Sequence, residues 1–434
     1  MELINEDHKK HIVVIGGGFA GLNFITQLFN SRYYEVTLVD KNNYNYFTPL
    51  LYQVATSFLE PASISYPFRK FFKNKRIGFR MASVLRVDPA ANMLYLSDGG
   101  ELSYDILVFA AGSRTNFFGN ESVRANAYSL KGIDDALYMR NELIKTVERA
   151  VIEPDPVKRE ELLTIVIGGG GPTGVEVAGM LAEMKRYILG NDYPLLKGSV
   201  SEIYIIDGSP FLLAPMSERS HADAYRLLDK QGVKIKLNMH VNLYENGEVH
   251  LSDGSVIRAG ALIWAAGVIA NSFEGIADTS MGKGRRMLTD AQNLVVGYDN
   301  IYAIGDISIQ FRDPAYPAGH PQLAQPAIQQ GKRLAKNLIL AAKGRAMKPF
   351  IYFDRGDMAI IGRRKAVADL FKHKLHLGGI LGLLSWLFIH LISLVNYNNK
   401  IKTLYNWGIA YLTHDQALRM IFRSENRENR VDKL

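Results

Sequence analysis

Two stretches of the sequence, IVVIGGGFAGL at residues 12–22 and IVIGGGGPTGVE at residues 165–176, share one pattern. In each, a run of β-branched residues leads into spaced glycines and then into the start of a helix. The glycines are Gly16, Gly18 and Gly21 in the first stretch and Gly169, Gly171 and Gly174 in the second. Such glycines allow a tight turn, let a pyrophosphate approach the backbone and let the helix pack on the strand, while the helix N-terminus attracts phosphates. We therefore predict an α/β fold with two Rossmann-like dinucleotide-binding units.

Each unit continues to a strand that ends in an aspartate. YEVTLVD ends at Asp40, 19 residues after Gly21, and EIYIID ends at Asp207, 33 residues after Gly174. The usual interval is ~20 residues, which places a carboxylate at an adenosine ribose. The second interval is longer because of residues 186–201, RYILGNDYPLLKGSVS, which we interpret as an extended helix and a loop. A carboxylate here opposes a 2′-phosphate and no Arg follows Asp207, so NADH is expected rather than NADPH.

Composition limits the chemistry. The 434 residues allow two or three domains, and the polar start MELINEDHKK does not resemble a secretory signal. There is no cysteine, which excludes disulfides, thiolate metal sites and thiol catalysis, and no metal site is expected. The net charge is +8, and residues 353–434 contain 13 Lys and Arg against 7 Asp and Glu. A basic tail fits nucleic acid, an anionic membrane or a solvated face, and the apolar sequence beside it favours the membrane over nucleic acid.

A third motif indicates which of the two units binds FAD and which binds NADH. NIYAIGDIS at residues 300–308 resembles the second flavin-contacting segment of flavoproteins with two dinucleotide-binding domains. That resemblance implies a discontinuous FAD domain, formed by the first glycine loop with Gly305 and Asp306, and an inserted NADH domain formed by the second loop. ILVFAAGS at residues 106–113 and ALIWAAGV at residues 261–268 fit the chain crossings between such domains.

The electron acceptor is indicated by LAQPAIQQG at residues 323–331, which follows a Pro/Gly-rich loop and begins a predicted helix. Its residues Ala324, Gln325, Ala327 and Gln329 match the AQxAxQ pattern of type II NADH dehydrogenases, the non-pumping NADH:quinone oxidoreductases. The alternative is an amphipathic helix with two surface glutamines. In that family the helix N-terminus points at the flavin pyrimidine edge, where a positive dipole end would stabilise an anion.

The resemblance covers nearly the whole chain. It includes residues 42–61 with Gln53, GPTGVEVAG with Glu176, and GDMAIIGRRKAVADL with Lys365. It implies hydride transfer from NADH to FAD and then electron transfer to a quinone, with Glu176, Lys365, Gln325 and Gln329 at the reaction. It also implies FAD or NADH contacts from Gly16, Gly18, Phe19, Ala20, Gly21, Asp40, Lys41, Gln53, Val84, Ala111, Gly112, Gly169, Gly171, Thr173, Gly174, Asp207, Gly267, Gly305, Asp306 and Ala324. For Glu176 the alternative is a helix-start carboxylate, and for Lys365 a surface cation.

Residues 375–399 contain no Asp, Glu, Lys or Arg, and these 25 residues are long enough to cross a bilayer. Their histidines, serines and glycines, and the amphipathic helical pattern that follows over residues 400–423, suit a membrane surface equally well. Trp386 and Trp407 are residue types typical of the interface. The family resemblance implies a peripheral, monotopic anchor on the cytoplasmic face of the cell membrane. A homodimer interface is the third interpretation of this segment.

We expect FAD-binding segments at residues 8–120 and 285–345, an NADH-binding domain at 121–284 and a membrane-anchoring region at 346–434. Two rival functions remain open from the residues. One is a soluble NADH-dependent flavin reductase for a protein acceptor such as ferredoxin, which leaves the apolar tail unexplained. The other is a non-catalytic flavin-binding redox sensor or scaffold.

Overall fold

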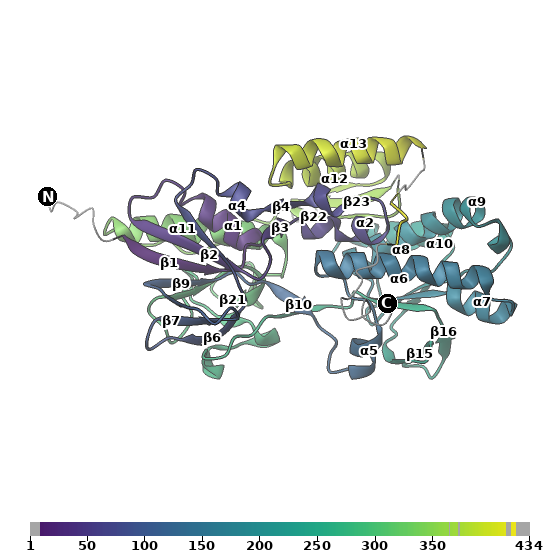
Figure 1. Ribbon diagram of the computed structural model, residues 1–434, viewed down its shortest axis with the longest axis horizontal. Coiled ribbons are helices and arrows are strands. Elements are labelled where there is room, and N and C mark those ends of the chain that lie inside the picture. The colour runs from purple at the N-terminus through teal and green to yellow at the C-terminus, as the bar shows by residue number, and fades with distance from the viewer. Residues whose placement is uncertain (1–8, 364, 372–373, 414–417, 422–434) are drawn as a thin grey trace, which may run out of the picture. The chain divides into compact units, whose positions relative to one another are not determined.

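A computed structural model describes residues 9–363, 365–371, 374–413 and 418–421. The chain folds as α/β and forms two compact units (Figure 1). Unit 1 comprises residues 1–46, 65–114 and 268–355, and unit 2 comprises residues 47–64, 115–267 and 356–434. Each unit is built around its own parallel sheet, as the two glycine-rich stretches predict.

Unit 1 has a five-stranded parallel sheet in the order β20-β9-β1-β2-β5. Its strands are β1 (Lys10–Ile15), β2 (Tyr34–Asp40), β5 (Ile77–Met81), β9 (Ile106–Phe109) and β20 (Ile301–Ala303). Ile12 and Val14 pack toward the helices α1 (Phe19–Thr26) and α11 (Ala324–Ala342) on one face. Val13 and Ile15 pack on the other face toward the antiparallel strands β6 (Val84–Asp88), β7 (Met93–Leu96) and β8 (Glu101–Ser103). Burial of both faces explains the unbroken apolar run of β1.

Helices α1 and α11 contact each other closely in unit 1. A Cβ on Gly331 of α11 would lie 2.3 Å from the backbone oxygen of Ala20, so only glycine fits at this crossing. The remaining elements of unit 1 are short: β3 (Tyr44–Tyr46) paired with β4 (Ser65–Pro67), α4 (Phe68–Phe71), β10 (Ser113–Thr115) paired with β18 (Val268–Ala270), and β19 (Met287–Leu288) paired with β21 (Ser308–Ile309). Strands β10 and β18 each follow one AAG run, at residues 110–112 and 265–267. Because these two strands pair, the two predicted chain crossings lie side by side.

Unit 2 has a four-stranded parallel sheet in the order β13-β12-β11-β17. Its strands are β11 (Ile165–Gly168), β12 (Ile203–Asp207), β13 (Val233–Leu237) and β17 (Ala261–Trp264). An antiparallel sheet packs on it, formed by β14 (Val241–Glu245), β15 (Glu248–Leu251) and β16 (Val256–Arg258). Its helices include α5 (Glu121–Asn126), α6 (Ile133–Ile152), α7 (Pro156–Leu163), α8 (Pro172–Met184) and α10 (Glu218–Lys230). The long insert before β12 extends α8 by a π-helical turn at Lys185–Leu189 and a short α9 (Gly190–Asp192).

The carboxy-terminal part of unit 2 begins with an antiparallel sheet of β22 (Gly356–Ile360), β23 (Ala366–Leu370) and β24 (Leu375–Leu377). Two helices follow, α12 (Gly379–Ser393) and α13 (Tyr397–Thr413), which are green-yellow and yellow in Figure 1. They pack against each other and around α2 (Leu51–Ala55) and α3 (Pro61–Ile64). Among the helices of the described residues, none has the length and apolar content needed to cross a bilayer.

Two details of this region correct the sequence analysis. Trp386 and Trp407 were expected at an interface, but their side chains are 0% and 2% exposed, because they pack against each other and the chain around Gln53. The amphipathic pattern over residues 400–423 also does not form one helix, since α13 ends at Thr413 and residues 418–421 are not helical.

Candidate functional site

The first glycine loop has the shape that a dinucleotide requires. Gly16 has φ +99°, and a Cβ there would lie 2.6 Å from the oxygen of Ala110. A Cβ on Gly21 would lie 2.0 Å from the oxygen of Gly16, so the helix packs on the turn only with glycine. In contrast, a Cβ on Gly18 would have no described atom within 4 Å, which leaves open space before the N-terminus of α1. This combination of a tight turn and an open approach fits the pyrophosphate of FAD.

Asp40, at the end of β2, is held beside this loop. One carboxylate oxygen accepts from the Gly17 N–H at 2.7 Å and the other from the Asn42 N–H at 2.8 Å. Burial raises the pKa of Asp40, while these two backbone donors and the adjacent Lys41 lower it in part. The fixed carboxylate retains lone pairs that a ribose hydroxyl can reach.

The late flavin segment lies at the same edge of the unit 1 sheet, because β9 and β20 are parallel to β1 and end beside it. Asp306 accepts from the hydroxyl of Ser113 at 2.7 Å, just after Ala111 and Gly112. Gln330, a residue that the sequence analysis did not single out, is buried on α11 and accepts from the Gly305 N–H at 2.6 Å. The only sequence signal for Gln330 is its place next to Gln329 in AIQQG.

The start of α11 packs on this segment. The side chain of Gln322 donates to the Asp306 carbonyl at 3.0 Å, and a Cβ on Gly305 would lie 3.4 Å from that of Ala327. The structure thus brings together the predicted unit 1 residues, which are Gly16, Gly18, Phe19, Ala20, Gly21, Asp40, Lys41, Ala111, Gly112, Gly305, Asp306 and Ala324. Val84 lies elsewhere in unit 1, at the start of β6.

The second glycine loop repeats the first. Gly169 has φ +116°, and a Cβ on Gly174 would lie 1.8 Å from the oxygen of Gly169. Gly171 has open space, like Gly18. Asp207 accepts from the Gly170 N–H at 2.5 Å and the Ser209 N–H at 2.6 Å, in the arrangement that Asp40 has in unit 1. Thr173 is exposed on the first turn of α8, and Gly267 follows β17 at the same sheet edge. Unit 2 therefore offers a second site of the same kind.

Glu176, in the second turn of α8, is a buried carboxyl. Its side chain is 7% exposed and receives a long contact, 3.4 Å, from the Ile360 N–H of β22. Burial raises the pKa of Glu176 to about 8, and the Ile360 N–H and the nearby Trp386 indole only partly oppose this. The Trp386 indole N–H does not reach hydrogen-bond geometry. Glu176 therefore holds a proton at neutral pH, as a proton donor must.

The turn after β22 approaches α8 directly beyond Glu176. A Cβ on Gly179 would lie 2.4 Å from the backbone nitrogen of Gly362, so glycine is required there. Ile360, which contacts Glu176, pairs with Ala366, the residue after Lys365. Lys365 is half-buried, and its carbonyl accepts from the Ile361 N–H at 2.7 Å. Ile360, which contacts Glu176, and Lys365 thus lie at the same end of the β22–β23 hairpin.

Gln53, which the family resemblance predicts as a cofactor contact, is part of this cluster in unit 2. It is 1% exposed, its Oε1 accepts from the Trp407 indole at 2.8 Å, and its amide donates to the Tyr52 hydroxyl at 2.9 Å. Burial, and then the nearby Glu176, raise the pKa of Tyr52 well above its usual value. His390 stacks on Trp386 at 3.8 Å, and burial lowers its pKa to about 4, so it is neutral. Uncharged aromatic side chains, those of Tyr52 and Trp386, therefore lie near Glu176.

The two predicted glutamines differ in their contacts. Gln329 exchanges two hydrogen bonds with the backbone of Phe353, at 2.9 Å and 3.0 Å, which fixes the chain after α11. Gln325 is half-buried on the first turn of α11, and its side chain has no hydrogen-bond partner among the described residues. Of the two, Gln325 has the donors and acceptors to contact a ligand.

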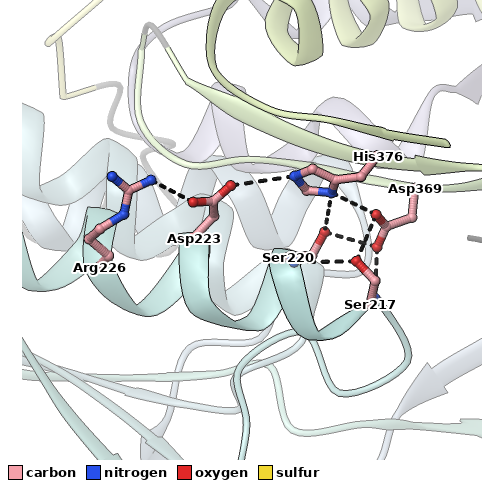
Figure 2. Close-up of polar contacts among 6 residues, drawn as sticks. All are labelled: Ser217, Ser220, Asp223, Arg226, Asp369 and His376. Atoms are coloured by element: carbon pink, nitrogen blue, oxygen red, sulfur yellow. Dashed lines mark hydrogen bonds and ion pairs between the residues drawn. The ribbon is translucent and has the colours of Figure 1, made fainter.

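The hairpin beside Glu176 is fastened to helix α10 by a polar network (Figure 2). Asp369, fully buried on β23, accepts from the Ser217 N–H at 2.7 Å, the Ser220 hydroxyl at 2.8 Å and the His376 ring at 2.8 Å. His376 also faces Asp223 at 3.4 Å, and Asp223 pairs with Arg226. Burial alone would raise the pKa of Asp369, but these donors lower it. Ser220 is fully buried and donates its hydroxyl hydrogen bond to Asp369. The network therefore has a structural role, and Ser220 is not a nucleophile.

Unit 2 also contains an apolar pocket, lined among others by Leu143, Ile144, Leu163, Ile165, Leu181 and Ile203. Ile165 and Ile203 are the first residues of β11 and β12, so the pocket lies at the opposite sheet edge from the glycine loop. Dinucleotides bind at the carboxyl edge of such sheets. This pocket is therefore separate from the predicted nucleotide site.

Comparisons with known proteins identify related oxidoreductases by sequence and by structure. A family model described as pyridine nucleotide-disulphide oxidoreductase matches residues 10–331. A type II NADH:quinone oxidoreductase of Mycobacterium tuberculosis is 34% identical, over 93% of this chain and 87% of the relative, and one of Staphylococcus aureus is 31% identical, over 84% and 90%. The fold resembles that of NDH2 from Plasmodium falciparum, solved with NADH, with a TM-score of 0.86 and 21% identity over 96% of this chain and all of that one.

Proposed function

This chain belongs to the type II NADH:quinone oxidoreductases, within the pyridine nucleotide-disulphide oxidoreductase family, and on that basis we propose that it passes two electrons from NADH through FAD to a membrane quinone without pumping protons. The observation that carries the proposal is a pair of dinucleotide folds in a chain without cysteine. Two such folds provide for a flavin and its reductant, and the lack of thiols excludes the disulphide chemistry for which the wider family is named.

We assign FAD to unit 1 and NADH to the glycine loop of unit 2. In unit 1 the open approach at Gly18 and the fixed Asp40 carboxylate support FAD, with Asp306 positioned by Ser113 at the same sheet edge. In unit 2 Asp207 supports NADH, because its carboxylate suits a ribose hydroxyl and repels a 2′-phosphate. FAD, when bound, supplies the two-electron chemistry that links a nicotinamide to a quinone.

Residues of this chain supply a proton for quinone reduction and position the substrates. Glu176 holds a proton at neutral pH, and we assign it the role of proton donor during quinone reduction. Gln325 is the candidate to contact a substrate, and Lys365, at the end of the turn after β22, is the candidate to balance charge there. Gln329 acts by holding Phe353.

We also propose that α12 and α13 dock the protein on the surface of a bilayer. Large apolar side chains are exposed along both helices, which are Ile380, Leu381, Leu384, Phe388 and Ile392 on α12 and Ile401, Leu404, Tyr405 and Ile409 on α13. A helix pair with such a face lies in the plane of the interface. The docked protein would be peripheral and on the cytoplasmic face of the cell membrane, where NADH is available. A homodimer through the same face is the competing arrangement, which mass measurement in detergent tests.

The decisive experiment separates the two half-reactions. The purified protein should be yellow, bleach rapidly with NADH in an anaerobic stopped-flow cell, and recover its colour with a short-chain quinone at enzymatic rates. A colourless protein that takes up no FAD would end the proposal. Recovery with ferredoxin but not with quinone would select the soluble reductase, and negligible turnover would select the redox sensor.

A further inference from the structure

Unit 1 contains a dense group of cations that the dinucleotide fold does not use. Five of the eight residues from Arg69 to Arg76 are basic, and residues 61–87 contain no Asp or Glu. They form what we call the basic patch, which consists of Arg69, Lys70, Lys73, Lys75 and Arg76. All five side chains are exposed, on and after the short helix α4.

Three of these five cations lie over aromatic rings instead of pairing with carboxylates. Arg69 lies 5.2 Å from the ring centre of Phe79, Lys70 lies 5.6 Å from that of Tyr66, and Lys75 lies 5.4 Å from that of Phe29. Phe29 and Tyr66 each contact Phe71, so these three rings form a continuous aromatic surface beneath the cations, which we call the aromatic floor. Within the part of the chain that the structure describes, no ion pair involves the basic patch.

Unpaired, clustered and exposed charges repel one another, which disfavours the fold unless an anion balances them. Some other surface cations of this chain have acidic partners, for example Arg80 with Asp98 and Arg258 with Glu161. The basic patch is distinguished by its density, because five of eight consecutive residues are basic and no Asp or Glu occurs in residues 61–87, and this density indicates an anionic partner. Its aromatic floor adds an amphipathic character that suits the headgroup region of a bilayer.

We infer that the basic patch binds the phosphates of anionic lipids and forms a second membrane contact, carried by unit 1. The inference rests on the membrane docking proposed for α12 and α13. The chain itself connects the two features: Thr403 and Asn406 of α13 bond to Ser63, and the basic patch begins six residues later in the sequence. The apolar helices supply attachment to any bilayer, whereas the basic patch supplies selectivity for negative charge.

The test compares two triple variants of the full-length holoenzyme in vesicle flotation. The patch variant carries Lys70→Gln, Lys73→Gln and Arg76→Gln. The matched control carries Lys336→Gln, Lys343→Gln and Arg345→Gln, which removes the same charge from exposed positions of unit 1. Flavin absorbance and NADH:short-chain-quinone activity in detergent should equal wild type in both, which confirms that each variant is folded.

Vesicles of phosphatidylcholine alone are compared with vesicles containing one-third phosphatidylglycerol. Removing one cation near the surface lowers the affinity for an anionic membrane about fivefold. The patch variant, which lacks three, should therefore bind anionic vesicles about 100-fold more weakly than wild type, while the control stays within about threefold. On neutral vesicles all three proteins should bind equally. Raising salt from about 0.1 M to about 0.5 M should erase the difference, because the screening length shortens.

Equal binding of the patch variant and the control to anionic vesicles would overturn the inference. Submicromolar binding of a single-stranded RNA by wild type, lost only in the patch variant, would replace the lipid with nucleic acid. If no protein binds neutral vesicles but wild type still prefers anionic ones, the docking of α12 and α13 fails while the basic patch assignment stands.

Discussion

Replacing Glu176 with Gln should make the protein more stable at alkaline pH and less able to reduce quinone. The carboxyl is buried and its pKa is raised from 4.5 to about 8. Gln has nearly the same shape and its oxygen can still accept the contact from the Ile360 N–H. The substitution therefore removes the titration and leaves the packing in place.

The magnitude follows from the pKa difference. A shift of about 3.5 units corresponds to about 5 kcal/mol between the protonated and ionised states in the fold. Below pH 4.5 the carboxyl is protonated in both the folded and the unfolded chain, so it has no effect. Between 4.5 and about 8 the unfolded chain releases the proton and the folded chain retains it, so wild-type stability falls by about 1.4 kcal/mol per pH unit relative to the variant.

The assay is thermal unfolding of wild type and Glu176→Gln from pH 5 to pH 9, with FAD saturating. The two melting temperatures should coincide near pH 5, and the variant should melt about 5 to 10 °C higher at pH 9. Glu245→Gln, an exposed carboxyl of the same unit, should follow wild type throughout. In stopped flow, Glu176→Gln should reduce its flavin with NADH normally but reoxidise it with quinone about 100-fold more slowly.

If the melting temperatures of wild type and Glu176→Gln changed in parallel from pH 5 to pH 9, the assignment of a neutral buried carboxyl would be refuted. Equal losses in both half-reactions would show that Glu176 acts on the flavin site as a whole and not on the quinone step.

Four further substitutions test other parts of the structure. Gly21→Ala should abolish FAD retention with loss of folding, because the new Cβ would clash with the Gly16 oxygen, whereas Gly18→Ala should fold normally and bind FAD more weakly, as measured by flavin release during dialysis. Gly174→Ala should destabilise unit 2 and raise the KM for NADH while FAD absorbance remains. Asp369→Asn should destabilise the protein by about 1 to 3 kcal/mol at pH 7 in urea unfolding, since it weakens charged hydrogen bonds from the Ser217 N–H, the buried Ser220 hydroxyl and the His376 ring. Because the native fold lowers the pKa of Asp369, this difference should shrink as the pH falls below about 4.

The sequence predicted the two nucleotide folds because the relevant constraints are local. The glycines of each loop and the aspartate of the next strand act over about 20 to 40 residues of chain, and the strand periodicity identifies which edge carries them. Asp40 and Asp207 accordingly lie beside their loops, where they accept hydrogen bonds from the N–H groups of Gly17 and Gly170. The longer interval before Asp207 changed nothing at the strand end, because the extra residues form the extension of α8 and its loop.

The surroundings of Glu176 could not be predicted in this way, because they come from contacts between distant parts of the chain. Gln53 bonds to Trp407 across 354 positions, and Ile360 reaches Glu176 across 184. No periodicity relates such pairs. Composition was misleading here: two tryptophans beside an apolar helix suggested an interface, yet both are buried. Their burial has a chemical consequence, because burial of the Glu176 carboxyl near the Trp386 indole is what raises the pKa of Glu176. The exposed side chains of α12 and α13 are instead mostly aliphatic, and these are the side chains that we propose contact the bilayer.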